Sequence, residues 1–217
     1  MPSHSDFNYF STHDFHVNKD ISASLSNNAF SFLDCNIRSI KANIDNLINM
    51  LSELYFPLSI TGLTETKLKT DQEEILNINI PGYNFLSQPS LYNAGGVGVF
   101  VKNGISYSCR EDLSSVKEGC ESLWIEIQND AEHNNICGII YRHPHGNLDS
   151  FMTHINTVIE KIHHESKYCV ILGDFNSDVL EFESHPGTND FLNAPNIFFC
   201  NQPGLLTIQQ HLLIISS

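Results

Sequence analysis

The sequence has no long apolar run. None of its stretches approaches the roughly 18 apolar residues that a membrane-spanning helix needs, so we expect no contact with a membrane. Residues 1–20 have neither the basic start nor the apolar centre of a secretory signal, which favours an intracellular protein. The cysteines form no Cys-x-x-Cys pair and show no other metal-ligand spacing, which indicates reduced thiols. They are Cys35, Cys109, Cys120, Cys137, Cys169 and Cys200.

Basic residues are scarce as well. Lysine and arginine number 11 against 25 acidic residues, which gives a net charge of −14. Because non-specific affinity for nucleic acid comes from the neutralisation of phosphates by basic side chains, this balance argues against such affinity. No basic cluster is typical of a nuclear import signal. Arg38, Lys67, Lys69 and Arg142 nevertheless lie near the motifs below, as a local salt-dependent basic rim or as ordinary solvated charges.

The chain divides into three regions by composition. Residues 1–28 are rich in Ser, Asn and His, show no sustained periodicity, and predict a poorly ordered lead-in. Residues 29–202 carry strand and helix patterns that no Pro/Gly/Ser linker interrupts, which predicts a single domain. Residues 203–217 form a separate tail.

Hydrophobic periodicity predicts an α/β fold. Amphipathic patterns predict helices over 42–54 and 148–162, and a short acidic helix is expected over 71–76. Strand patterns occur at 29–33, 58–64, 83–86, 96–101, 105–108, 122–127, 136–141 and 168–172. The dipeptide Asn103-Gly104 predicts a hairpin between two of these strands. Helices that flank a run of strands indicate two packed sheets with helices outside.

Polar side chains follow four of the apolar strand patterns. They are Asn36, Glu65, Tyr141 and the pair Asp174 and Asn176. Open α/β sheets bind ligands at the carboxyl ends of their strands, and carboxylate and amide oxygens suit both a hard divalent cation and a phosphate. The pattern therefore predicts one Mg²⁺ that stabilises charge on a phosphate under attack by water. Taken singly, each residue also fits a turn, a solvated loop acid or a strand-end aromatic.

Five short motifs resemble the endonuclease/exonuclease/phosphatase family, which is also called DNase I-like. More narrowly, they resemble the endonuclease domain of non-LTR retrotransposons. The matching segments are Leu33–Ser39, Gly62–Thr66, Gly95–Val99, Ile140–Pro144 and Ile171–Asn176. Their order and spacing agree with the family over residues 30–200.

The resemblance implies a fold and a set of roles. The fold would be a four-layer α-β-β-α sandwich of two mixed sheets, with DNA as the substrate and Mg²⁺, or alternatively Mn²⁺, as the cofactor. Glu65 and Asn36 would bind the metal; Asp174, Asn176 and Tyr141 would be catalytic; Arg38, Arg142 and Lys67 would contact phosphate or DNA. It also implies a nuclear location and a reverse transcriptase that this chain does not contain. The oligomeric state stays open.

The end of the sequence departs from the family. The family ends with a Thr-Arg segment, a Ser-x-x-Ile-Asp motif and a final Ser-Asp-His, and none of these follows Asn201. Residues 203–215 can be back-translated into one possible set of codons. Read in the frame that starts one nucleotide earlier, with a preceding adenine, these codons encode Thr-Arg-Ile-Thr-Asp-His-Ser-Ala-Thr-Leu-Ile-Asp-His. We therefore interpret residues 203–217 as the product of a frameshift near Gln202, and the domain as truncated without its last strands. His211 is not taken as the catalytic histidine.

The expected function is that of a metal-dependent phosphodiester hydrolase. It would be the DNA-nicking endonuclease of a non-LTR retrotransposon, impaired by the loss of the C-terminal Asp and His motifs. A phosphatase or phospholipase of the same fold is one alternative, since a fold does not determine a substrate. A catalytically dead remnant that at most binds nucleic acid is the other.

Overall fold

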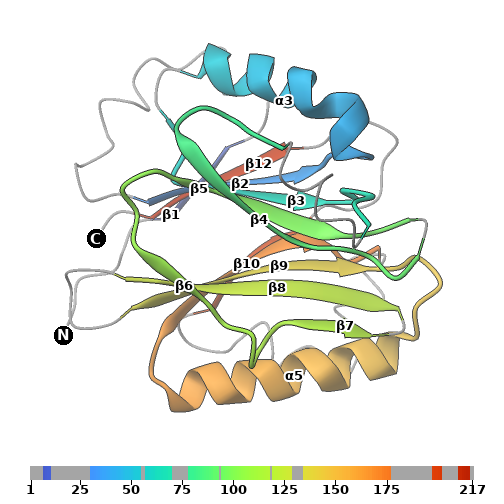
Figure 1. Ribbon diagram of the computed structural model, residues 1–217. Coiled ribbons are helices and arrows are strands. Elements are labelled where there is room, and N and C mark those ends of the chain that lie inside the picture. The colour runs from blue at the N-terminus through green and yellow to red at the C-terminus, as the bar shows by residue number, and fades with distance from the viewer. Residues whose placement is uncertain are drawn as a thin grey trace.

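Two mixed β-sheets lie face to face in the computed structural model, and a helix covers the outer side of each sheet (Figure 1). The model describes the backbone of residues 7–10, 30–54, 57–69, 78–92, 94–117, 119–128, 134–176, 197–201 and 210–215, and the side chains of these ranges between 30 and 176. The helices are α3 (Ile40–Glu53) and α5 (Leu148–His164). The four layers confirm the predicted α/β sandwich of two mixed sheets.

The first sheet has the strand order β1-β12-β2-β3-β5-β4. Its strands are β1 (Phe7–Phe10), β2 (Phe30–Asn36), β3 (Ile60–Thr64), β4 (Tyr83–Gln88), β5 (Val97–Lys102) and β12 (Gln210–Ile215). Only β2 and β3 pair in parallel within it. The carboxyl ends of these two strands therefore meet at one edge of the sheet, and α3 is the crossover that connects them (Figure 1).

The second sheet has the order β11-β10-β9-β8-β6, with β7 also paired to β8. Its strands are β6 (Tyr107–Cys109), β7 (Ser115–Lys117), β8 (Cys120–Ile127), β9 (Asn135–Arg142), β10 (Tyr168–Asp174) and β11 (Ile197–Asn201). Strands β9 and β10 are parallel, and α5 connects them. Their carboxyl ends also lie together, with Tyr141 paired to Asp174.

Strand alternation decides which side chains enter the space between the sheets. Along β9, Cys137, Ile139 and Tyr141 pack between the sheets, whereas Ile136 and Ile140 pack toward α5. Along β10, Val170 and Leu172 face inward. Because side chains on a strand alternate between faces, the same period directs Asp174 inward, next to Tyr141. An apolar layer between two sheets thus ends in polar side chains at one edge.

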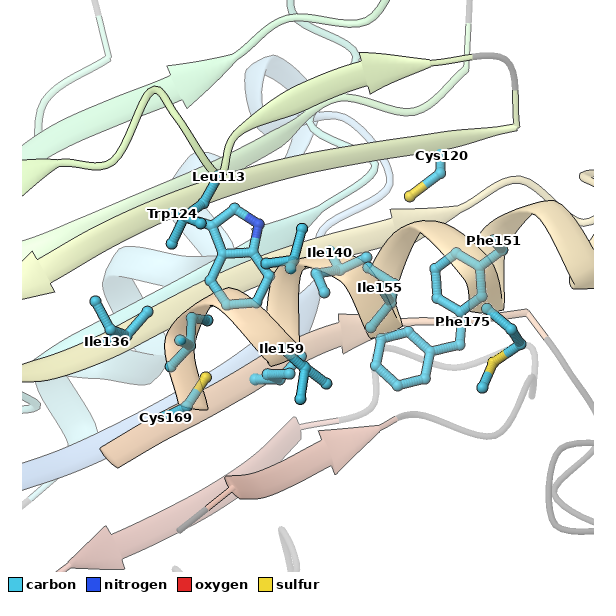
Figure 2. Packing of buried hydrophobic residues seen from close by; sticks show 14 residues of the cluster. Leu113, Cys120, Trp124, Ile136, Ile140, Phe151, Ile155, Ile159, Cys169 and Phe175 are labelled. Carbon is cyan, nitrogen blue, oxygen red and sulfur yellow. The ribbon is translucent and has the colours of Figure 1, made fainter. Parts of the chain in front are cut away.

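Helix α5 closes the outer face of the second sheet. Phe151, Ile155 and Ile159 from its apolar face pack against Trp124 and other sheet residues (Figure 2). The side chain of Asn147 caps the helix by accepting from the backbone N–H of Ser150 at 2.9 Å. The last turn carries basic residues, which interact favourably with the negative end of the helix dipole. This helix covers the outer face of β9 and β10 and contributes no side chain to their inner face.

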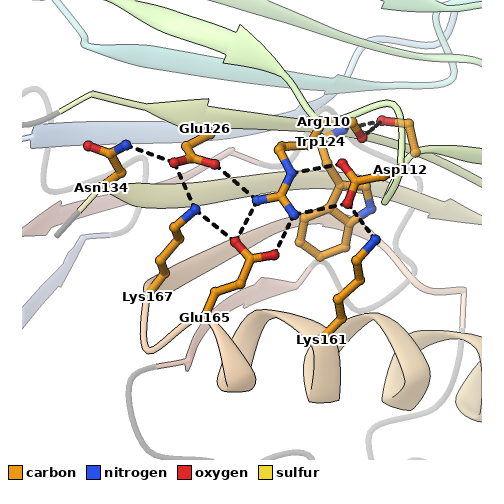
Figure 3. Close-up of polar contacts among 9 residues, drawn as sticks. Arg110, Asp112, Trp124, Glu126, Asn134, Lys161, Glu165 and Lys167 are labelled. Carbon is orange, nitrogen blue, oxygen red and sulfur yellow. Dashed lines mark hydrogen bonds and ion pairs between the residues drawn. The ribbon is translucent and has the colours of Figure 1, made fainter.

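An ion-pair network stabilises the end of the second sheet that lies opposite to Tyr141 and Asp174. Arg110 donates to Asp112 at 2.8 Å, to Glu126 at 3.0 Å and to Glu165 at 2.6 Å (Figure 3). Lys167 reaches both Glu126 and Glu165, at 2.8 and 2.7 Å. Glu126 is near the end of β8 and Glu165 follows α5, so the network joins these elements away from the edge that carries Tyr141 and Asp174.

The structure differs from the sequence-based expectations at several points. The predicted hairpin at Asn103-Gly104 is wrong: β5 and β6 belong to different sheets, and the turn carries the chain from one to the other. Strand β7 and strand β11 were not predicted. The acidic helix expected over 71–76 lies outside the described residues. None of the described helices is long and apolar enough to cross a membrane.

The chain ends contain strands as well. β1 lies within the region predicted as a poorly ordered lead-in, and β12 within the region predicted as an aberrant tail; the two strands pair with each other, and β12 also pairs with β2. The division at residues 28 and 202, the frameshift and the absence of the last strands stay predictions.

Candidate active site

One amide joins the two acidic residues that the sequence singles out. The side-chain nitrogen Nδ2 of Asn36 donates to Oε1 of Glu65 at 2.8 Å and to Oδ2 of Asp174 at 2.9 Å. Asn36 ends β2 of the first sheet, Glu65 follows β3 of the same sheet, and Asp174 ends β10 of the second. The candidate site therefore spans the two sheets at the carboxyl ends of their parallel strands.

The loops at this edge have an unusual backbone conformation. Glu65, Lys67 and Asn176 have φ values of 51°, 54° and 44°, and Arg38 and Ser39 share the positive sign. Ser166 is the one other non-glycine residue of this kind among those described. Left-handed residues with side chains cost free energy and tend to cluster at functional sites. The backbone holds them in place: the N–H of Ser39 donates to the carbonyl of Glu65 at 2.8 Å.

Tyr141 lies near the carboxylates and is paired with Asp174 across β9 and β10. Its hydroxyl is hydrogen-bonded to the side chain of Asn176, and its ring is almost completely buried. Burial, followed by the negative charges of Glu65 and Asp174, raises the pKa of the Tyr141 phenol above its ordinary value. The phenol therefore keeps its proton at neutral pH and can donate it in a hydrogen bond to an anionic oxygen.

Asn176 is fixed by its own backbone and by β9. Its N–H donates to Oδ1 of Asp174 at 3.0 Å, which is the turn that Asp and Asn commonly form with the backbone two residues on. Its side-chain nitrogen donates to the carbonyl of Arg142 at 2.7 Å. The Asp174 carboxylate and the Asn176 amide are thus held side by side.

Arg142 lies beneath the site rather than on its surface. The buried guanidinium donates to the carbonyl of Phe175 at 2.5 Å, to that of Gly146 at 2.5 Å, and to that of Asn176. These bonds orient the loop that carries Asp174 and Asn176. The charged group is thus directed at backbone oxygens inside the protein, and the phosphate contact expected from the sequence stays a prediction.

The other basic residues of the expected rim are exposed. Arg38 and Lys67 lie on the two loops that follow β2 and β3, and the side chains of both are open to solvent. The backbone N–H of Arg38 donates to Oδ1 of Asn36 at 3.2 Å, so this loop also orients the amide that joins the carboxylates. Their expected contact with DNA stays a prediction.

The two carboxylates form a donor set for a hard cation. Burial raises the pKa of Asp174, the neighbouring Glu65 charge raises it further, and hydrogen bonds from Asn176 and Asn36 oppose the shift. A divalent cation would offset the proximity of the two negative charges. The described residues contain no group of three or more Asp, Glu, His or Cys side chains around one point. Mg²⁺ commonly fits such a site, since one or two carboxylates hold it while water and phosphate fill its other positions.

Sequence reasoning missed Glu121 and His143. Glu121 is fully buried and is paired with Tyr141 across β8 and β9. It accepts from the N–H of Gly96 at 2.6 Å and from the hydroxyl of Ser90, and it lies 3.2 Å from Nε2 of His143. The alternation of Leu123, Ile125 and Ile127 along β8 could have placed Glu121 on the inner face. Its partners come from distant loops and carry no such signal.

Comparison with known families gives a match over most of the chain. The model of the endonuclease/exonuclease/phosphatase family matches residues 34–210. The chain belongs to this family. The match includes Asn36, Glu65, Tyr141 and Asp174, which all lie at the edge described above. None of the curated proteins compared with the chain matches it.

Solved structures show the same family fold at low sequence identity. The endonuclease domain of TRAS1, a telomere-specific non-LTR retrotransposon, has a TM-score of 0.56 at 14% identity, over 76% of this chain and 70% of that chain. The catalytic domain of Xenopus laevis APE2 has a TM-score of 0.55 at 21% identity, over 75% and 67%. D. rerio TDP2, in complex with a single-strand DNA product, has a TM-score of 0.51 at 12% identity, over 87% and 84%. The fold is thus one that nucleases use.

Proposed function

We propose that this chain is a metal-dependent phosphodiester hydrolase, derived from the DNA-nicking endonuclease of a non-LTR retrotransposon. The observation that carries the proposal is the amide of Asn36, which brings the carboxylates of Glu65 and Asp174 together across the two sheets. Family membership and the fold shared with a retrotransposon endonuclease support the same conclusion.

Each residue at this edge would have a separate role. Glu65, assisted by the nearby Asp174 carboxylate, would hold Mg²⁺, which when bound supplies positive charge for the phosphate oxygens. Asp174 would orient the attacking water, because its carboxylate is fixed by Asn36 and by the N–H of Asn176. Tyr141, which keeps its proton, would donate to a phosphate oxygen. Asn176 would hold the scissile phosphate from the same side.

Nicking of supercoiled plasmid in Mg²⁺ tests the proposal. The full chain and its Glu65→Ala variant are compared, with EDTA as a second control. Nicking by the wild-type chain that is lost in both controls supports the proposal. Equal rates for the two proteins would reject a metal-dependent nuclease. The assay includes prolonged incubation, so that slow nicking is also detected.

A catalytically dead remnant is the second candidate. This candidate predicts binding of a short oligonucleotide without nicking at any metal concentration. Hydrolysis of a phosphomonoester or a phospholipid, with none of a DNA strand, would instead indicate a phosphatase or phospholipase of the same fold.

A further inference from the structure

A buried carboxylate lies beside the candidate site without belonging to the expected machinery. Glu121 has no exposed surface, and an isolated charge at such a position would be strongly unfavourable. Three donors offset this cost: the N–H of Gly96 at 2.6 Å, the hydroxyl of Ser90, and Nε2 of His143 at 3.2 Å. A charge with this set of partners is held in a defined position.

The imidazole of His143 is held on several sides. The centroid of its ring lies 5.0 Å from that of Tyr141, with an angle of 74° between the ring planes, and 5.3 Å from that of Tyr92, with an angle of 76°. Both are edge-to-face arrangements. With Nε2 directed at Glu121, the other ring nitrogen, Nδ1, is the one that can meet a ligand. The side chain of His143 is 16% exposed, so part of the ring reaches solvent.

His143 adjoins the candidate site through Tyr141. The hydroxyl of Tyr141 is hydrogen-bonded to the side chain of Asn176. It also interacts electrostatically with Glu65, Asp174 and Glu121. One aromatic ring therefore separates the imidazole from the residues that would hold the phosphate. The chain places a Glu–His pair and the acidic pair on neighbouring sides of Tyr141.

Acidic side chains predominate at this edge. Glu65 and Asp174 are acidic, a phosphodiester brings further negative charge, and the guanidinium of Arg142 is directed at backbone carbonyls. Within the described part of the chain, the titratable groups that face His143 are Glu121 from β8, Tyr92 from the loop before β5, and Tyr141 from its own strand. Of these, Glu121 is the carboxylic acid, and its Oε1 lies 3.2 Å from Nε2 of His143.

We propose that His143, as an imidazolium held by Glu121, donates a hydrogen bond from Nδ1 to a non-bridging oxygen of the substrate's phosphodiester. Glu121 is its positioning residue, and it acts through the bond to Nε2. A buried acid that orients an imidazole and stabilises its protonated form is an established arrangement in enzymes. The inference rests on the proposed function, because it assigns the phosphate of the same substrate a second contact on the Tyr141 side.

Nuclear magnetic resonance of the full chain in Mg²⁺ tests the contact directly. The probe is the dinucleotide thymidylyl-3′,5′-thymidine, which contains a single phosphodiester. The protein carries ¹⁵N in its 11 histidines and its backbone amides, and the His143→Gln variant assigns the His143 ring signals. We expect Nδ1 of His143 to shift with the same saturation curve as the backbone amide of Asn176.

Two other outcomes distinguish a failure of this inference from a failure of the proposed function. A shift of the Asn176 amide without a shift of the His143 ring would overturn the inference and leave the proposed function standing. If neither signal moves at saturating dinucleotide and plasmid nicking is also absent, both proposals fail. In the Glu121→Gln variant, the response of the His143 ring should weaken while the amide of Asn176 still shifts.

Steady-state cleavage of a short oligonucleotide gives an independent measurement. His143→Phe keeps a ring but removes both nitrogens, and we expect kcat/KM to fall about 100-fold, as for the loss of one charge-stabilising donor. His143→Gln keeps a neutral donor and should lose less. His164→Gln, on the exposed last turn of α5, should match the wild type. Equal kcat/KM for His143→Phe and wild type, with both proteins folded, would overturn the inference.

Discussion

The side-chain amide of Asn36 donates to the carboxylate of Asp174 at 2.9 Å, although 138 residues separate them in the chain. The two residues end strands of different sheets, and the same amide nitrogen also reaches Glu65. One neutral side chain therefore fixes the separation of two negative charges. The predictions below follow from this bond and from the packing that supports it.

Removal of the bridging amide should weaken the protein when no metal is present. In Asn36→Leu, the carboxylates of Glu65 and Asp174 lose a shared donor, and we expect the free energy of unfolding to fall by about 1–3 kcal/mol. Mg²⁺ should restore part of this loss, because a ligand that binds only the folded state stabilises it. Urea unfolding in EDTA and in Mg²⁺ measures both effects. Asn49→Leu, on the exposed side of α3, should change stability by less than about 0.5 kcal/mol.

Binding of Mg²⁺ should weaken as the pH falls, and it should do so at a higher pH than for an ordinary aspartate. Burial raises the pKa of Asp174, so the folded protein holds this proton where a free Asp has lost it. The associated stability is present at low pH and is lost as the pH rises through the raised pKa. Since the cation needs the ionised carboxylate, the two compete.

Isothermal titration calorimetry in steps from about pH 8 to about pH 4.5 measures this competition, with proton release seen as a dependence of the heat on the buffer. Asp174→Asn should bind Mg²⁺ more weakly and with a flatter pH profile. An affinity that stays constant over this range would show that Asp174 is ionised throughout.

The glycine before Asp174 should not tolerate a side chain. Gly173 has a φ of 149°, and a Cβ there would collide with the backbone carbonyl of Ile140 on β9. Because backbone cannot move aside as a flexible side chain can, we expect Gly173→Ala to cost about 3 kcal/mol or more. Gly104→Ala is the matched control: φ is 91° but nothing lies within 4 Å, so only the backbone term of about 1 kcal/mol remains. Chemical denaturation of the two variants should therefore give clearly different midpoints.

The Arg110 network should contribute stability that is lost in acid. Hydrogen bonds from Arg110 are the main reason why the pKa of Glu165 lies at about 2, below its usual value of 4.5. A lowered pKa contributes stability above the ordinary value, which then disappears as the pH falls from 4.5 to about 2. Arg110→Met should reduce this acid sensitivity and lower stability at neutral pH. Unfolding midpoints measured across this range should fall less steeply for the variant; parallel curves would contradict the assignment.

The strand ends could be predicted from the sequence because the signal is local. Each apolar run shows where a strand stops, and the period of two shows which face its last residues occupy, as for Tyr141 and Asp174. The two outer helices follow from their own periodicity. The separation of β5 from β6 could not be predicted, since Asn103-Gly104 specifies a tight turn but not the sheet in which the next strand will pair.

The buried hydrogen bonds that hold the site residues in place could not be predicted from the sequence. Arg142 lies in a motif that suggests contact with phosphate, yet its guanidinium meets carbonyls more than thirty residues away along the chain. Glu121 has partners on two loops, Ser90 and Gly96, that are remote in sequence. Such contacts depend on how the sheets are placed against each other, and no pattern within one element encodes them.

The seam between the two sheets has a consequence for heat inactivation. Each sheet is held together by its own backbone ladder, whereas the aliphatic layer and a few hydrogen bonds, such as that from Gly96 to Glu121, keep Asn36 and Glu65 opposite Asp174. A slide of one sheet over the other by the width of a methyl group would pull the three side chains apart while both ladders stayed whole. On warming, the protein should therefore lose the ability to capture its ligand at temperatures where circular dichroism still reports a full complement of strands.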